Sequence, residues 1–259
     1  MPHASTRQAD IRPVATPPPA REARAAPCSH CRLAPTCLPA RLGPEDVARL
    51  GAVVHLRAPL ARGQRLFREG ESPERLFIVR SGCLRSSVVT GDGGEQVVGF
   101  HPPGDVVGFD TSLDTFRHST AIALERTSVC AVALDELRRL SGTVPGLQEQ
   151  LYRLIGRELA GNRQHLLMMG RMGSYRRLAL FLRTWSWRMA AAGFPGDELP
   201  LPMSRDDIAS YLGLAQETVS RAVSRLQERG IVRVQGRHVR ITDPERLAEA
   251  GGMEPLEPA

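Results

Sequence analysis

The sequence predicts an α+β protein, with a small β-barrel or β-roll in its first half, one long helix in the middle and a helix-turn-helix near its end. Three observations predict this order. Between residues 54 and 134, short apolar runs alternate with glycine turns at regular spacing, which is typical of a compact all-β domain. From Pro145 onward the apolar residues recur at helical spacing. Residues 204–230 then join two short amphipathic segments through Gly213, which is the helix-turn-helix pattern.

The composition indicates a basic globular protein. The 259 residues carry 34 basic residues, all of them Arg, against 28 acidic residues, and the formal net charge of +6 suits a polyanionic partner. No apolar run approaches the ~18 residues that a membrane span requires, and the N-terminus shows no secretory signal. We therefore expect a cytoplasmic protein, in which clustered cysteines are metal ligands or redox sensors rather than disulfides.

Five segments follow from these patterns. Residues 1–27 are rich in Pro, Ala and Arg without apolar periodicity, and are expected to form a disordered tail. Residues 28–142 are expected to hold a cysteine-rich loop, a short helix and the β domain, 143–173 the long helix, 174–250 the helix-turn-helix domain, and 251–259 a tail. The predicted strands are 65–67, 76–79, 84–89, 96–100 and 128–134.

The long helix carries a heptad seam, the pattern by which one helix packs along an identical partner. Asn162 interrupts this seam with one polar group, which can fix register and oligomeric state. The same stripe also fits a helix that packs on its own domain, so a homodimer seam and intramolecular packing both stay open. The predicted seam residues are Tyr152, Ile155, Leu159, Asn162, Leu166 and Met169.

The helix-turn-helix segment indicates binding to double-stranded DNA. Ser204 and Asp207 match a capping box that starts the first helix. The second helix starts at Gln216 and has an apolar face of Val219, Val223 and Leu226. Residues 231–241 follow as a β-hairpin wing. The alternative is a plain helical hairpin with a solvated polar face.

The outward face of the second helix carries side chains that can recognise bases. In this geometry its N-terminal part enters the major groove. Arg221 can donate two hydrogen bonds to guanine, Glu217 can accept one from cytosine, and Arg225 suits a phosphate. The predicted DNA-contacting residues are Gln216, Glu217, Ser220, Arg221 and Arg225.

Three cysteines within ten residues indicate one metal centre. Cys28, Cys31 and Cys37 have the spacing C-x2-C-x5-C, and iron–sulfur clusters are held by cysteine thiolates. A fourth ligand would come from Cys83, expected at a turn, or from Cys130, expected within a strand. A zinc site and a disulfide-based sensor are the alternatives.

With these motifs assembled, the chain resembles the Crp/Fnr family, and within it the FNR-type anaerobic regulators, from about residue 28 to the wing. The cysteine spacing resembles the cluster ligands of that group, and EQVVGFHPPGDVVGFD at 95–110 resembles its cyclic-nucleotide-binding-like β-roll. The segment ERTSVC at 125–130 resembles the stretch that carries the fourth ligand, so the resemblance selects Cys130 over Cys83. QETVSR at 216–221 resembles a recognition helix that reads a half-site like TTGAT, and 152–169 resembles the dimerisation helix.

The resemblance implies an oxygen-responsive transcription regulator and not an enzyme. A [4Fe–4S] cluster on Cys28, Cys31, Cys37 and Cys130 would promote dimerisation and binding to a palindromic DNA site without oxygen. The exposed turn at 90–94 would either contact RNA polymerase, as in activators of the family, or be a solvated hairpin tip. One departure from the pattern is Arg32, a bulky cation directly after the second ligand.

Three other functions compete with this interpretation. A nucleotide-gated regulator needs a buried Arg beside Ser or Thr, and the candidates Arg117 and Ser119 are separated by His118. A regulator gated by a small ligand or by thiol redox chemistry without a cluster is the second. The third, an enzyme, lacks a glycine-rich phosphate loop, an H-E-x-x-H motif and a nucleophile elbow, so we expect no catalysis.

Overall fold

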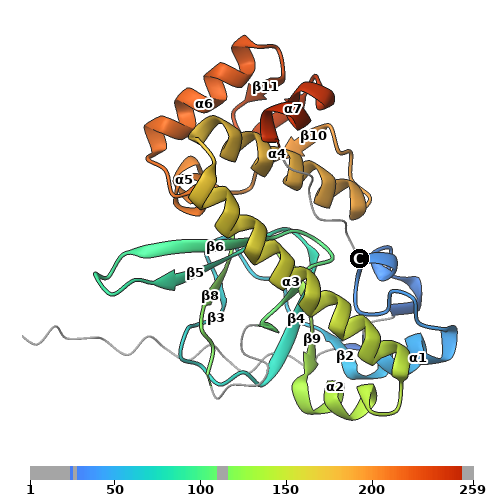
Figure 1. The fold of residues 1–259 in the computed structure, drawn as a ribbon. Coiled ribbons are helices and arrows are strands. Elements are labelled where there is room, and N and C mark those ends of the chain that lie inside the picture. The colour runs from blue at the N-terminus through green and yellow to red at the C-terminus, as the bar shows by residue number, and fades with distance from the viewer. Residues whose placement is uncertain (1–23, 26–27, 110–115, 253–259) are drawn as a thin grey trace, which may run out of the picture.

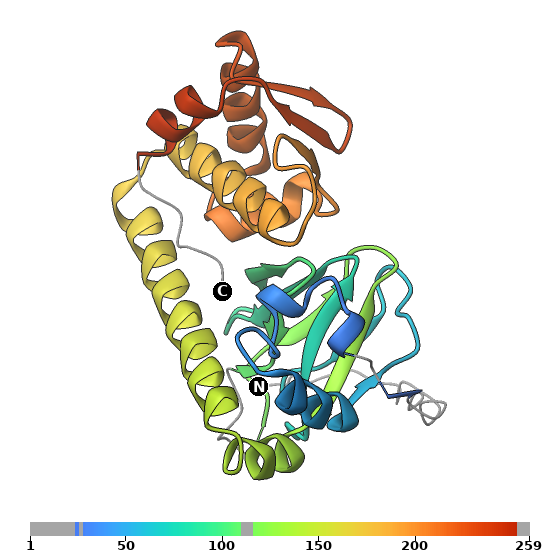
Figure 2. The same ribbon diagram turned by 90° about the vertical axis from the view of Figure 1, so that its right-hand side faces the viewer.

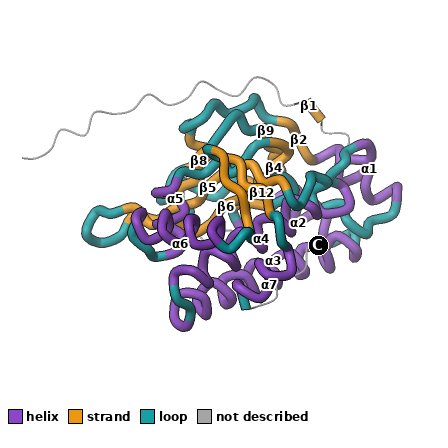
Figure 3. Tube along the Cα trace, turned by 90° about the horizontal axis from the view of Figure 1, so that it is seen from above, coloured by secondary structure: helices purple, strands orange, loops and turns teal. Residues whose placement is uncertain are grey.

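The computed structural model describes residues 24–25, 28–109 and 116–252 (Figure 1). An N-terminal β-roll and a C-terminal domain lie one above the other, and the long helix α3 (Pro145–Arg171) runs past the roll to the C-terminal domain (Figure 1). Seen from above, helices α4, α6 and α7 of the C-terminal domain lie largely to one side of the strands of the roll (Figure 3). The expected α+β fold class is confirmed.

In the described part of the chain, the roll consists of two antiparallel sheets that enclose a core of Phe67, Phe77, Val79 and Val129. One sheet has the order β1-β2-β9-β4-β7 and the other the order β3-β8-β5-β6. The strands are β1 (Arg24–Ala25), β2 (Val54–Leu56), β3 (Arg65–Phe67), β4 (Arg75–Ser81), β5 (Leu84–Val89), β6 (Glu95–His101), β7 (Val106–Val107), β8 (Thr120–Ala123) and β9 (Ser128–Ala133).

Helices cover the outer face of the sheet that contains β4 and β9. Leu76 and Val132 of these strands pack against Leu50, Leu137 and Leu147 from three helices, and all five are buried. The helical elements of this domain are η1 (Cys28–His30), η2 (Ala34–Thr36), α1 (Pro44–Val53) and α2 (Leu134–Ser141), followed by α3. The N-terminal cysteine segment is therefore held between α1 and the sheet.

One side of α3 packs on the two domains, and the other side is open. The predicted seam residues Tyr152, Ile155, Leu159 and Leu166 are 65, 37, 65 and 71% exposed, and Asn162 is exposed as well. Met169 differs, because it is partly buried against the C-terminal domain. Packing within the chain therefore accounts for Met169 but leaves the four apolar seam residues uncovered.

The C-terminal domain is a helix-turn-helix with a β-hairpin wing. Ser204 and Asp207 form the predicted capping box at the start of α5, and Gly213 ends that helix in the left-handed conformation with φ of +58°. Only glycine adopts this conformation readily. The elements are α4 (Ser174–Ala191), β10 (Glu198–Pro200), α5 (Arg205–Leu212), α6 (Gln216–Glu228), β11 (Val232–Gln235), β12 (His238–Ile241) and α7 (Pro244–Gly251).

Some elements differ from the sequence prediction at the edges of the domains. The region around 193–202, expected as a loop, contains β10, which pairs with β12 about 40 residues later, a partner that no local pattern reveals. Most of the expected disordered tail 1–27 and of the tail 251–259 lies outside the described residues. Within them, Arg24–Ala25 pairs with β2 as β1, and Gly251 ends α7. None of the described helices has the length and apolar character needed to cross a membrane.

The cysteine pocket and the DNA-reading helix

Four of the cysteines line one pocket. Cys28, Cys31 and Cys37 reach it from the N-terminal loop, and Cys130 reaches it from β9. Cys130 is fixed in the middle of its sheet, where it pairs with Leu56 of β2 on one side and with Ile78 of β4 on the other. The remaining walls are mostly apolar, and Arg80 is the charged residue among them.

The pKa values of three of these thiols, Cys28, Cys37 and Cys130, are raised, which favours their protonated forms at neutral pH. Burial raises the pKa of Cys28 and of Cys37, and it raises the pKa of Cys130 to about 11. The neighbouring cysteines add to each of these shifts, because several thiolates close together repel one another. The Arg80 guanidinium acts in the opposite direction and lowers the pKa of Cys28 and Cys130. Arg80 therefore favours the thiolate forms that bind metals.

Cys83 lies apart from this pocket. Its side chain is 2% exposed and packs in the core that holds Phe100, and its Sγ donates to the Leu84 carbonyl oxygen at 3.4 Å. It directly follows Gly82, whose φ of +78° confirms the expected turn. The structure thus brings together the four cysteines chosen as ligands and leaves Cys83 out.

The donor set of the pocket fits an iron–sulfur cluster. All five cysteines are free thiols, and four of them surround one mostly apolar site with a cation beside it. Four thiolates are also a donor set for a single zinc ion, whose sulfur ligands meet at ~2.3 Å from one point. Among the described residues, no three His, Cys, Asp or Glu side chains converge in a way that would hold one metal ion.

Gln150 joins the cysteine loop to α3 and was missed in the sequence. Its side chain is 1% exposed, and its Nε2 donates to the carbonyl oxygen of Cys37 at 3.2 Å. The signal was a polar residue between the apolar positions Leu147 and Leu154, on the face of α3 that packs inward. A buried amide needs a partner, so this position indicated a specific polar contact.

The recognition helix α6 presents its predicted side chains to solvent. Its inner face, made of Val219, Ala222, Val223 and Leu226, is buried. The exposed residues include all five that were predicted to contact DNA: Gln216, Glu217, Ser220, Arg221 and Arg225. Side chains of these types can pair with the donor and acceptor groups of the major groove, so the exposed face is consistent with the predicted base contacts.

Tyr175 in the first turn of α4 contacts the basic end of α6, a role that was not predicted from the sequence. The guanidinium groups of Arg225 and Arg229 lie 4.6 and 5.4 Å from the centre of its ring. Such cation–π contacts limit the rotamers of both arginines. These contacts therefore hold two positive charges close together near the C-terminal end of α6, after the residues predicted to contact bases.

Arg117, the candidate for a nucleotide-binding arginine, is part of the roll core. It is 2% exposed, its guanidinium lies 3.9 Å from the centre of the Phe67 ring, and its Nη2 donates to the Arg75 carbonyl oxygen at 2.7 Å. These contacts give Arg117 a structural role.

The arrangement of these elements is matched by known families. Residues 57–143 match the cyclic nucleotide-binding domain, and residues 176–250 match the Crp-like helix-turn-helix domain. The chain belongs to the Crp/Fnr family. It is therefore a DNA-binding transcription regulator and not an enzyme, and regulators of this family typically dimerise.

Crp/Fnr proteins from several bacteria are similar along most of the chain. The transcriptional activator protein FnrA of Stutzerimonas stutzeri is 42% identical over 234 residues, which cover 90% of this chain and 96% of the relative. The fumarate and nitrate reduction regulatory protein of Escherichia coli is 36% identical over 225 residues, covering 87 and 90%. The solved structure of FixK2 from Bradyrhizobium japonicum is 32% identical with a TM-score of 0.71, and the match covers 78% of this chain and 99% of that one.

Proposed function

We propose that this Crp/Fnr regulator responds to oxygen through a [4Fe–4S] cluster held by Cys28, Cys31, Cys37 and Cys130. The observation that carries this proposal is the pocket in which four thiols from two distant chain segments meet beside Arg80. The relatives support an anaerobic role, since one is a fumarate and nitrate reduction regulator and another, from Haemophilus influenzae, is called an anaerobic regulatory protein.

Each part of the chain has a defined task in this proposal. When bound, the cluster would supply iron and sulfide that oxygen can oxidise. The four cysteines hold it, the apolar walls limit access of water, and Arg80 offsets part of the thiolate charge. Gln150 ties the loop to α3, so the position of the loop and that of the dimerisation helix depend on each other.

The dimer forms along the open side of α3 in this proposal. The exposed side chains of Tyr152, Ile155, Leu159 and Leu166 form the seam that pairing with an identical helix would bury. A symmetric dimer presents two recognition helices to a palindromic site of the TTGAT type, through Glu217, Ser220 and Arg221. The exposed turn at residues 90–94 contacts RNA polymerase, and the protein acts in the cytoplasm.

The proposal is tested on protein purified without oxygen. We expect a brown protein with about four irons per chain that binds a TTGAT-type palindrome and loses colour and DNA affinity together in air. Cys130→Ala should abolish the colour and the oxygen response, whereas the matched variant Cys83→Ala should keep both. Iron and sulfide content, visible absorbance and fluorescence anisotropy of labelled DNA measure these outcomes.

Other results would contradict the cluster. A colourless wild-type protein whose DNA affinity is the same with and without air would point to a small ligand as the signal. A colourless protein whose affinity changes with thiol oxidation would point to cysteine redox chemistry. A Cys83→Ala variant that loses its iron while Cys130→Ala retains it would overturn the choice of the fourth ligand.

A further inference from the structure

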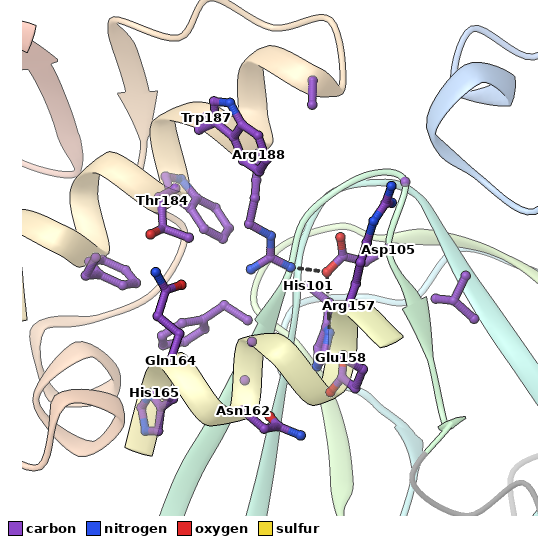
Figure 4. Close-up of a pocket in the computed structure, with 18 of the residues that line it drawn as sticks. His101, Asp105, Arg157, Glu158, Asn162, Gln164, His165, Thr184, Trp187 and Arg188 are labelled. Atoms are coloured by element: carbon purple, nitrogen blue, oxygen red, sulfur yellow. Dashed lines mark hydrogen bonds and ion pairs between the residues drawn. The ribbon is translucent and has the colours of Figure 1, made fainter. Parts of the chain in front are cut away.

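The roll and the C-terminal domain meet through a shared apolar core around Phe100 and Phe181 and through polar contacts beside it. A cavity of about 270 Å³ lies between β6, α3 and α4, and Arg188 extends across it from α4 to Asp105 (Figure 4). Arg188 Nη2 and Asp105 Oδ2 form an ion pair, and His101 Nδ1 lies 3.6 Å from the same carboxylate oxygen. Because Asp105 belongs to the roll and Arg188 belongs to α4, their ion pair links the two domains.

The cysteine loop contacts the turn that carries Asp105. In this turn Gly104 has a φ of +98°, and a Cβ on it would lie only 3.2 Å from Thr36 Oγ1, in the loop between Cys31 and Cys37. The turn is also bonded to β4, since Gly104 N donates to Val79 O and Val79 N donates to Asp105 O, both at 2.9 Å. Val79 itself lines the cysteine pocket. The anchor of Arg188 is thus built against that pocket.

A second contact runs directly from the cysteine loop to the C-terminal domain. The guanidinium of Arg32, the residue after Cys31, lies 4.7 Å from the centre of the Phe194 ring. Phe194 follows α4, packs on the core of the C-terminal domain, and is held by a bond from its amide to the Met189 carbonyl oxygen at 3.0 Å. The N-terminal loop lies on the side of the roll that faces this domain (Figure 2).

Both contacts end near the C-terminal end of α4. Arg188 lies in its last turns, and Phe194 lies in the loop that follows. We propose that the cysteine loop positions the DNA-binding domain of its own protomer through the Arg32–Phe194 contact, in addition to acting on the dimerisation helix. This proposal rests on the proposed function. In this proposal Arg32 and Phe194 are positioning residues. Through their contact, filling of the cysteine pocket changes the position of the DNA-binding domain in the same chain.

The expected size of the effect follows from the interaction. A ligand shifts a conformational equilibrium only by the difference in its interactions with the two states. One exposed cation–π contact corresponds to a change in equilibrium of about two- to fivefold. The Arg32–Phe194 contact should therefore change the stability of the segment around Phe194 by about this factor when the cysteine pocket is filled.

Amide hydrogen exchange of the segment 189–197 tests the proposal in cluster-loaded and cluster-free full-length protein. In the wild type we expect the exchange rate of this segment to differ about two- to fivefold between the two forms. Arg32→Gln and Phe194→Leu should each remove most of this difference, and the double variant should add nothing further. The matched control Arg41→Gln removes one positive charge from the segment after Cys37 and should respond like the wild type.

The outcomes separate the two proposals. Loaded wild type whose segment exchanges at the same rate as in the cluster-free form, or an Arg32→Gln variant that keeps the full difference, would overturn the role of Arg32 while the cluster stands. Wild-type protein that takes up no iron and sulfide would overturn both. Iron content and visible absorbance are therefore measured on each sample before exchange.

Discussion

The Nε2 of Gln150 in α3 donates to the carbonyl oxygen of Cys37 at 3.2 Å, and the Gln150 side chain is almost fully buried. This bond joins one of the proposed cluster ligands to the helix that carries the exposed apolar seam. A buried hydrogen bond of this kind specifies one position of the loop on the helix, because any shift would leave a polar group without a partner.

Replacement of Gln150 should uncouple the loop from α3. We expect Gln150→Ala to lower the free energy of unfolding by about 1–3 kcal/mol, since it removes a buried hydrogen bond to the Cys37 carbonyl oxygen and opens a small cavity. The exposed neighbour in Gln148→Ala should change it by less than about 0.5 kcal/mol. Urea denaturation of the two variants measures the difference. Equal losses in the free energy of unfolding would show that the bond to Cys37 does not stabilise the fold.

Asn162 should set the strength of the dimer in protein without a cluster. It is exposed within the predicted seam, where two symmetry-related copies would approach each other. In Asn162→Asp two carboxylates would face each other at pH 7, and we expect dimer affinity to fall about tenfold. Sedimentation of the wild type, Asn162→Asp and the neutral variant Asn162→Ser tests this. Equal dimerisation of all three would contradict a seam at this position.

Arg221 and Arg225 should affect DNA binding in different ways. Arg221→Ala is expected to weaken binding to the palindrome by about 1–3 kcal/mol and to relax discrimination at one base pair. Arg225→Ala should weaken binding to all sequences alike and reduce the slope of log affinity against log salt by about one. Titrations of matched and mismatched duplexes at several salt concentrations distinguish the two. If Arg225→Ala alone changed the base preference, the assignment would be reversed.

The Cys130 thiol should react slowly in protein without a cluster. Burial raises its pKa to about 11, two units above the value of 9.0 for an unperturbed thiol, so at pH 8 its thiolate fraction is about a hundredfold lower. The rate of alkylation by iodoacetamide should therefore rise about tenfold per pH unit up to pH 10, with no plateau near 9. Arg80→Gln should slow it further, because Arg80 lowers this pKa. A plateau near pH 9 in mass-spectrometric rates would contradict the burial.

Arg177 should stabilise the joint between α3 and α4. Its guanidinium donates to the carbonyl oxygens of Met172, Met169 and Leu212 at 2.7–2.8 Å. Because bonds from a charged donor contribute about 1.5–3 kcal/mol each and are not additive, Arg177→Leu should cost about 3 kcal/mol of stability. The exposed neighbour in Arg176→Leu is the control. Thermal denaturation should show a clearly lower midpoint for Arg177→Leu alone.

The sequence alone determined the elements whose signals are local. The capping box of Ser204 and Asp207, the left-handed Gly213 and the buried face of α6 each depend on residues a few positions apart, so their patterns are visible in one segment. The same holds for the 27-residue α3, which starts at Pro145 as expected. Short-range hydrogen bonds and side-chain periodicity are sufficient for such elements.

The tertiary structure alone decided which distant residues meet. Spacing left Cys130 and Cys83 open, and only the family resemblance selected Cys130. The pairing of β9 between β2 and β4 brings Cys130 to the N-terminal loop, while Cys83 enters another core. The contacts of Gln150 with Cys37 and of Arg32 with Phe194 likewise join residues more than 100 positions apart. Such contacts depend on how whole elements pack, and a polar or aromatic residue in a local pattern does not specify its partner.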